Sequence, residues 1–225
     1  MTTPTTEPVP PSKQPKPESF LDWFHVNSRL VGLGGAVVLV AAGVAWYVPT
    51  QRAQRNENAD RQLLMAKQSL APGNQNLPLA EVDLQKVADR YQGTASGAEA
   101  AMLLAQLKLD KGDAQGAVTA LKALTSKVKS GPNAAAAAGL LGDALSQLGK
   151  TAEAAAQYEQ AAKLTELPNE RTTLLARAGH AYMAVNQTSD ARRVWEVLAK
   201  QQDNHSVADE ARVRLGELDA MAARG

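Results

Sequence analysis

A pattern typical of paired helices recurs three times in this chain, at a constant offset of 37 residues. Each copy has a small residue, a turn residue seven positions later, a second small residue five positions further on, and a bulky residue four positions after that. The three sets are Ala105, Gly112, Ala117 and Leu121; Gly142, Gly149, Ala154 and Tyr158; and Gly179, Asn186, Ala191 and Trp195. Because one helical hairpin cannot bury its apolar face alone, the pattern predicts hairpins stacked into an all-α solenoid.

Each position of the pattern has a physical role. The two small residues fit where neighbouring helices cross closely. The turn residue is glycine or asparagine, which tolerate the left-handed conformation common after a helix. The bulky residue (Leu121, Tyr158 or Trp195) lies one helical turn beyond the second small residue and is expected to fill the space between hairpins.

The repeat extends beyond these three copies in both directions. Apolar spacing predicts an earlier second helix over Leu79–Tyr91, with a partner helix over about residues 55–70. That partner would be continuous with the preceding apolar stretch but for Pro49. A closing helix is expected at about residues 206–223. The prediction is three full hairpins, or four with the first, and a capping helix.

Residues 30–48 contain no charged side chain. At the helical rise these nineteen residues span about 28 Å, close to the thickness of a bilayer core, so we predict a single transmembrane helix there. Trp46 and Tyr47 lie at its end, where aromatic side chains favour the membrane interface. The sequence therefore divides into a disordered Pro-rich tail (1–18), an amphipathic lead-in (19–29), the transmembrane helix (30–48) and the repeat domain (49–225).

Two alternatives to a retained membrane anchor are a buried helix of a soluble protein and a cleaved signal peptide. The apolar run is long for either, and it begins only at residue 30. Basic residues lie on both sides of the run, so charge does not decide which side is cytoplasmic.

Composition argues against several classes of function. The net charge is +1, which argues against nucleic-acid binding. There is no cysteine, so disulfides, thiolate catalysis and cysteine-ligated metals are excluded. His25, His180 and His205 are far apart and have no metal-ligand spacing, and no phosphate-binding loop is present. We predict no enzymatic activity, catalytic residue, metal, cofactor or small-molecule substrate.

The clearest copy, with Gly142, Gly149, Ala154 and Tyr158, resembles the tetratricopeptide repeat, whose usual period is 34 residues. The longer period here implies longer helices or longer loops between hairpins. In such arrays the first helices line a concave groove that binds protein segments. The groove residues predicted here are Met102, Gln106, Leu109, Asp143, Gln147, His180 and Met183. They include no cluster of Lys and Arg, which argues against capture of an acidic peptide terminus.

The whole arrangement is similar to the YfgM-like family of ancillary subunits of the bacterial Sec translocon. The similarity lies in the aromatic segment Phe20–Phe24, the glycine-rich run from Gly34 to Trp46, and the repeat helices that contain Lys111–Ala114 and Ala191–Glu196. It implies an inner-membrane protein with a cytoplasmic N-terminus and a periplasmic repeat domain. It also implies that the partners are Sec translocon subunits and periplasmic chaperones. From the residues alone, an envelope-assembly or cell-division scaffold and a ligand-sensing regulatory module remain open.

Overall fold

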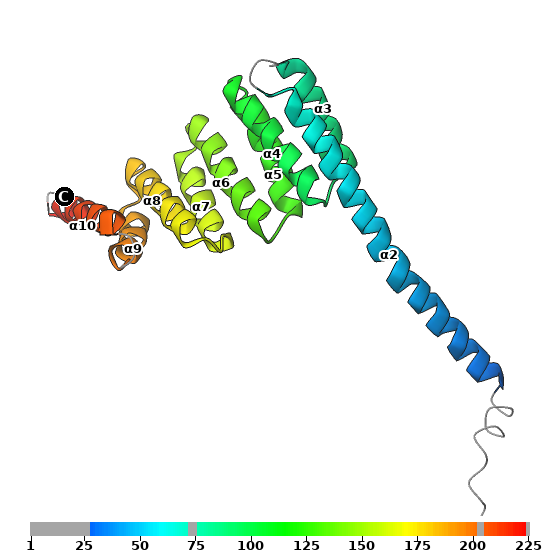
Figure 1. Cartoon of the computed structure of the whole chain (residues 1–225). Helices are drawn as coiled ribbons and strands as arrows, with labels where there is room; N and C mark the ends of the chain where they lie inside the picture. The colour runs from blue at the N-terminus through cyan, green and yellow to red at the C-terminus, as the bar shows by residue number, and fades with distance from the viewer. Residues whose placement is uncertain (1–27, 72–75, 202–204, 224–225) are drawn as a thin grey trace, which may run out of the picture. The chain divides into compact units, whose positions relative to one another are not determined.

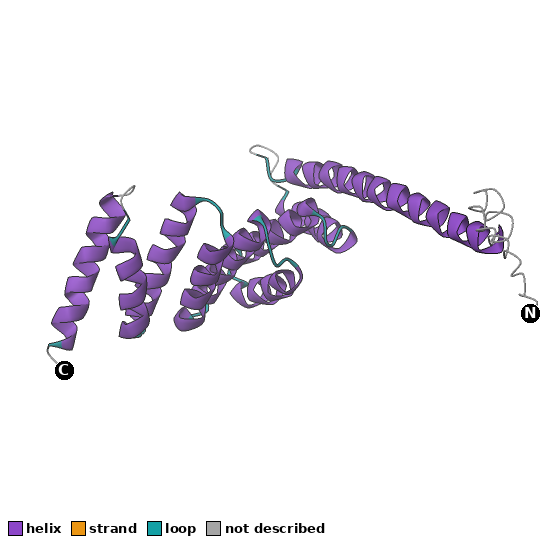
Figure 2. Cartoon of the chain, turned by 90° about the horizontal axis from the view of Figure 1, so that it is seen from below, coloured by secondary structure: helices purple, strands orange, loops and turns teal. Residues whose placement is uncertain are grey.

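All regular secondary structure in the described part of the chain is helical (Figures 1 and 2). The computed structural model describes residues 28–71, 76–201 and 205–223, with side chains from residue 37 onward. The chain divides by its internal contacts into two units, Met1–Arg52 and Ala53–Gly225. The predicted all-α class is confirmed for the repeat domain.

Helix α2 (Ser28–Gln68) begins in the first unit. Its apolar side chains there are exposed: Val37 is 65%, Leu39 75% and Trp46 73% exposed. Pro49 lies inside this helix and does not end it, although proline cannot donate a backbone hydrogen bond. The partner helix expected at about residues 55–70 is therefore the second part of α2.

No helix in the described part of the chain combines the length and the apolar character that crossing a membrane requires. The transmembrane helix predicted at residues 30–48 is thus not confirmed. Residues 30–48 are helical, but described side chains begin at Val37, and only twelve residues of the run remain up to Val48. A span needs about 20. The predicted tail (1–18) and most of the lead-in (19–29) lie outside the described residues.

The second unit consists of stacked hairpins closed by a last helix (Figure 1). The end of α2 pairs with α3 (Leu77–Arg90), and three further hairpins follow. They are α4 (Ala95–Asp110) with α5 (Ala114–Lys127), α6 (Pro132–Gln147) with α7 (Thr151–Leu164), and α8 (Pro168–Ala184) with α9 (Thr188–Ala199). Helix α10 (His205–Ala222) packs against α9. The predicted hairpins and capping helix are all present.

The turns inside the last three hairpins have one geometry. Gly112, Gly149 and Asn186 have positive φ angles of 83°, 72° and 58°. In each turn the next residue donates its N–H to a carbonyl five residues back, at 2.8 to 2.9 Å. These bonds satisfy carbonyl groups at the helix end, which explains why glycine or asparagine recurs there.

Alanine and leucine form most of the core of the second unit. One apolar cluster joins Ala59, Leu63 and Ala66 of α2 to residues of α3 and α4, and a larger one runs from α4 to α10. Trp195 and Leu121 are fully buried in the larger cluster. Burial of these side chains between successive hairpins supplies most of the driving force for stacking.

Candidate partner-binding groove

Gly142 of α6 brings a tyrosine close to the helix backbone. A Cβ atom added at Gly142 would lie 2.4 Å from Cε1 of Tyr158, a distance that real side chains do not adopt. Glycine therefore lets the Tyr158 ring lie directly against α6. The hydroxyl of Tyr158 then reaches the next residue of α6 and donates a hydrogen bond of 2.8 Å to Asp143.

Arg177 of α8 completes this cluster. Its guanidinium forms an ion pair with Asp143 and donates a 3.1 Å hydrogen bond to the hydroxyl of Tyr158. It also lies over the Tyr158 ring, with Cζ 4.3 Å from the ring centroid, within the range of a cation–π interaction. Three helices, α6, α7 and α8, thus meet at one polar cluster whose charges cancel.

Partial burial changes the proton affinity of this cluster. Burial raises the pKa of the Tyr158 hydroxyl, so the group stays protonated and remains a donor. Burial also lowers the pKa of the Arg177 guanidinium. The usual pKa of arginine is so far above neutral that the group still stays charged. The cluster is therefore a fixed arrangement of donors and acceptors near neutral pH.

The cluster borders a polar hollow of about 360 Å³ on the first helices of the second and third hairpins. The hollow is lined by Gln106, Leu109, Asp143, Ser146, Gln147, Tyr158 and Arg177. Ser146 and Gln147 are exposed, and their side chains form no hydrogen bond within the described part of the chain. These groups are available to a ligand that offers hydrogen-bonding atoms.

The next hairpin repeats the same arrangement with different residues. A Cβ atom at Gly179 would lie 2.6 Å from the Trp195 ring, and Trp195 donates from Nε1 to the sulfur of Met183 at 3.2 Å. The His180 ring meets Trp195 edge-on, with centroids 4.9 Å apart. Nε2 of His180 lies 2.9 Å from a carboxylate oxygen of Glu210 in α10. His180 therefore links α8 to both α9 and α10, and Met183 links α8 to α9.

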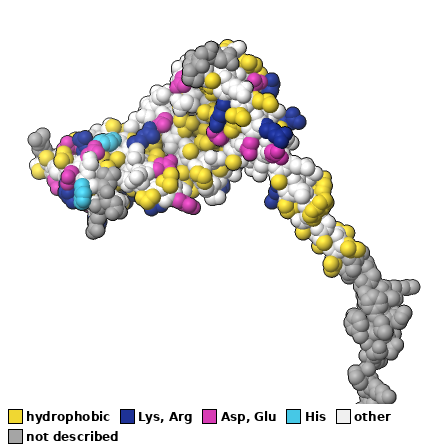
Figure 3. Space-filling view, viewed as in Figure 1, with side chains coloured by type: hydrophobic (Ala, Val, Ile, Leu, Met, Phe, Trp, Pro, Cys, Tyr) yellow, Lys and Arg dark blue, Asp and Glu magenta, His cyan; other side chains and the backbone are white. Residues whose placement is uncertain are grey.

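Charged side chains on the repeat domain alternate in sign. Figure 3 shows acidic and basic groups interspersed on the visible face. Some ion pairs in the described residues join neighbouring helices, as in Lys111–Glu81 and Arg192–Asp219, and others lie within one helix, as in Arg61–Glu57. On this face, charges of opposite sign lie close enough to compensate one another.

Comparisons with known proteins agree with this geometry. Residues 22–133 match the profile of a family described as tetratricopeptide repeat-like domain. A putative kinesin light chain of nearly identical TPR-like repeats from Podosopora anserina is 19% identical, with a TM-score of 0.55; the match covers 75% of this chain and 88% of that one. The repeat domain has a tetratricopeptide repeat-like fold.

Two further solved structures show the same tetratricopeptide repeat-like fold. A tetratricopeptide repeat protein from Parabacteroides merdae is 13% identical, with a TM-score of 0.57 over 73% of this chain and 61% of that one. BtubC from P. vanneervenii is 16% identical, with a TM-score of 0.55 over 87% of this chain and 84% of that one. A comparison with curated proteins finds no match. Tetratricopeptide-like repeats generally act as scaffolds for protein–protein interaction and are not typically enzymes.

The tetratricopeptide repeat-like fold brings four of the seven predicted groove residues to one hollow: Gln106, Leu109, Asp143 and Gln147. Leu109 is only 5% exposed and belongs mainly to the core. Met102 is partly buried against that core, His180 contacts Glu210 of α10, and Met183 contacts Trp195 of α9.

Sequence reasoning missed Ser146 and Arg177 and gave Tyr158 only a packing role. The repeat itself contained a signal for Arg177. The equivalent positions at offsets of 37 are Leu103 and Leu140, so an arginine there interrupts an apolar series. A charged residue at a repeat position that is otherwise apolar indicates a specific polar partner.

Proposed function

We propose that this chain is a membrane-anchored scaffold that binds a segment of a partner protein in the polar hollow of its first helices. We further propose that it is an accessory subunit that links the Sec translocon to periplasmic chaperones. The observation that carries the binding function is the hollow itself, in which donors and acceptors from α4, α6, α7 and α8 converge.

The chemistry of the hollow favours an uncharged, polar stretch of peptide. The Asp143 charge is balanced by Arg177, so neither a strongly acidic nor a strongly basic ligand is favoured. Ser146 and Gln147 offer a hydroxyl and an amide, which match the N–H and C=O groups of an extended backbone. Each such hydrogen bond contributes about 0.5–1.5 kcal/mol net.

The support for a membrane anchor is the uncharged run of residues 30–48 and the exposure of its described part. Val37, Val38, Leu39 and Val40 point into solvent around one helix, each at least 65% exposed. An apolar helix exposed on every face needs an apolar environment to cover it. A bilayer with the N-terminus on the cytoplasmic side fits the resemblance to translocon subunits.

The anchor and its direction are tested by fractionation and protease protection. We expect the full chain to stay with membranes after alkaline carbonate washing. In intact spheroplasts the repeat domain should be cleaved by added protease. Release by carbonate would contradict the anchor, and resistance to protease would contradict the periplasmic placement.

The partner is tested by crosslinking in cells. A photo-reactive amino acid at Gln147, in the hollow, should crosslink to translocon subunits or periplasmic chaperones. The same amino acid at Ala156, an exposed position of α7, is the matched control. Crosslinks to division or envelope-assembly proteins would support the alternative scaffold. Equal crosslinking at both positions would contradict the proposal that the polar hollow binds the partner.

A further inference from the structure

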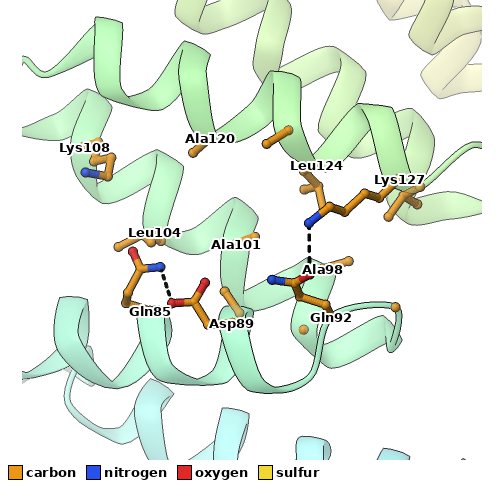
Figure 4. Close-up of a pocket in the computed structure, with 15 residues that line it drawn as sticks. Gln85, Asp89, Gln92, Ala98, Ala101, Leu104, Lys108, Ala120, Leu124 and Lys127 are labelled. Atoms are coloured by element: carbon orange, nitrogen blue, oxygen red, sulfur yellow. Dashed lines mark hydrogen bonds between the residues drawn. The ribbon is translucent and has the colours of Figure 1, made fainter.

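A second hollow, lined mainly by apolar side chains, lies between α3 and α5 (Figure 4). Helix α4 contributes Ala98, Ala101 and Leu104 to it, and α5 contributes Ala120 and Leu124. Its volume is about 190 Å³, and it shares no residue with the polar hollow described above. It is therefore a separate surface of the repeat domain.

The fold does not require this hollow to be apolar. One repeat further along, a hollow of about 220 Å³ lies between α5 and α7. There Gln157 and Gln160 occupy the positions that Ala120 and Ala123 have in the first hollow. Since the same hairpin geometry accepts long polar side chains, the alanines of the first hollow are a feature of that site.

The charged side chains at the edge of the hollow are Asp89, Lys108 and Lys127. The Lys127 ammonium donates to the side-chain oxygen of Gln92 at 2.9 Å, and within the described residues it has no carboxylate partner. Lys108 lies 3.7 Å from Asp113, and Asp89 accepts a 2.9 Å hydrogen bond from Gln85. Since Asp113 balances Lys108, and Lys127 has no carboxylate partner among the described residues, Lys127 is the lining cation to which a carboxylate of a ligand can bind.

We propose that this hollow binds one large apolar side chain of a partner protein, next to a carboxylate that pairs with Lys127. The volume suits one such side chain and is well below the roughly 300–1,000 Å³ of sites for drug-sized ligands. Apolar side chains seated in small pockets, flanked by polar contacts, are the usual anchors of protein interfaces. The occupant is therefore a peptide segment with an aromatic residue beside Glu or Asp.

The test uses the full chain in lipid nanodiscs with labelled alanine and leucine methyl groups. Three capped peptides are the probes: acetyl-Gly-Phe-Glu-amide, acetyl-Gly-Phe-Gln-amide and acetyl-Gly-Ala-Glu-amide. We expect the first to shift the NMR signals of Ala101, Ala120 and Leu124 in a saturable way. The Gln peptide should bind about three- to fivefold more weakly, because a surface ion pair contributes at most about 1 kcal/mol. The Ala peptide should cause no saturable shift.

Two variants provide the controls. Ala120→Gln with Ala123→Gln copies the neighbouring hollow and keeps good helix formers, so it should fold and bind at least about tenfold more weakly. Lys127→Gln should abolish the difference between the Glu and Gln peptides. Unchanged binding by the alanine double variant, or equal shifts at Ala138 in the neighbouring hollow, would overturn the proposal. The NMR signals come from residues of the apolar hollow, whereas the polar hollow is tested by crosslinking from position 147. Failure of one proposal is therefore distinguishable from failure of the other.

Discussion

Arg177 joins two hairpins through a side chain that could have been leucine. Its guanidinium contacts Asp143 and Tyr158, whereas the equivalent residues Leu103 and Leu140 are apolar. The repeat geometry thus tolerates either kind of residue, and arginine adds polar character to the groove. This residue belongs to the site more than to the core.

Replacing Arg177 with leucine should therefore affect binding more than folding. We expect the free energy of unfolding to change by about 1 kcal/mol or less, because the ion pair is half exposed. Crosslinking from position 147 should fall, since Asp143 is left without its cation. Arg192→Leu is the matched control. It also removes one arginine from an exposed ion pair, that with Asp219, but neither residue lines the polar hollow. Urea unfolding and crosslink yield are the measurements, and equal losses of crosslinking in both variants would contradict the role of Arg177.

The glycines of the first helices are expected to be sensitive to a single methyl group. Gly142→Ala and Gly179→Ala should each lower the free energy of unfolding by about 1–3 kcal/mol, because Cβ would overlap the Tyr158 or Trp195 ring. Gly216 in α10 has nothing within 4 Å of an added Cβ, so Gly216→Ala should stabilise the protein by about 0.5–1 kcal/mol. Thermal or urea unfolding distinguishes the two outcomes. A stabilising Gly142→Ala would show that the ring does not lie against α6.

At the scale of elements, one buried carboxylate connects α7, α8 and α9. Glu159 is only 8% exposed and accepts hydrogen bonds from Arg193 at 2.7 and 3.0 Å and from the Tyr182 hydroxyl at 2.7 Å. The Arg193 bonds, followed by that from Tyr182, hold the pKa of Glu159 below its ordinary value of 4.5. Burial, together with the Glu159 hydrogen bond, raises the pKa of Tyr182 to about 12. The network fixes the stacking of the last two hairpins.

This network makes stability depend on pH. The pKa of Glu159 is lower in the folded than in the unfolded chain, so its contribution is complete above about 4.5 and is lost as pH falls through the folded value. Glu159→Gln should lower the free energy of unfolding by about 1–2 kcal/mol at neutral pH. The difference in this free energy between the variant and the native chain should shrink as the pH falls. Glu196→Gln, at the equivalent exposed position of α9, should change little. If the loss of unfolding free energy in Glu159→Gln did not depend on pH, the lowered pKa of Glu159 would be contradicted. Urea unfolding over a pH series measures both.

At the scale of the whole molecule, the repeat domain depends on the second part of α2. Ala59, Leu63 and Ala66 are buried with α3 and α4, and Arg55 donates to the carbonyls of Arg90 and Gln92 at the end of α3. A fragment of residues 53–225 should therefore keep its helical content and unfold cooperatively. The free energy of unfolding of a fragment of residues 72–225 should be several kcal/mol lower, since removing α2 exposes Leu84 and its neighbours. Circular dichroism and urea unfolding compare the two; equal stability would place the domain boundary after α2.

Residues within one hairpin were the easiest to assign from sequence. The turn geometry at Gly112, Gly149 and Asn186 follows from the backbone preferences of glycine and asparagine. The position of Pro49 was misleading, because a proline inside a helix costs free energy but does not always end it. Leu109 was assigned to the groove, yet it is mostly buried, since position along a helix does not determine how far a neighbouring hairpin covers it.

The sequence by itself determined the hairpins, their 37-residue period and the small residues at the helix crossings, because these depend on contacts between residues near in the chain. Only the tertiary structure decided which polar groups meet. Asp143, Tyr158 and Arg177 lie on three different helices and come together because successive hairpins stack with a fixed rotation. The alanine-lined hollow between α3 and α5 has the same origin. Both surfaces depend on the angle between hairpins, which is set by packing across the whole solenoid.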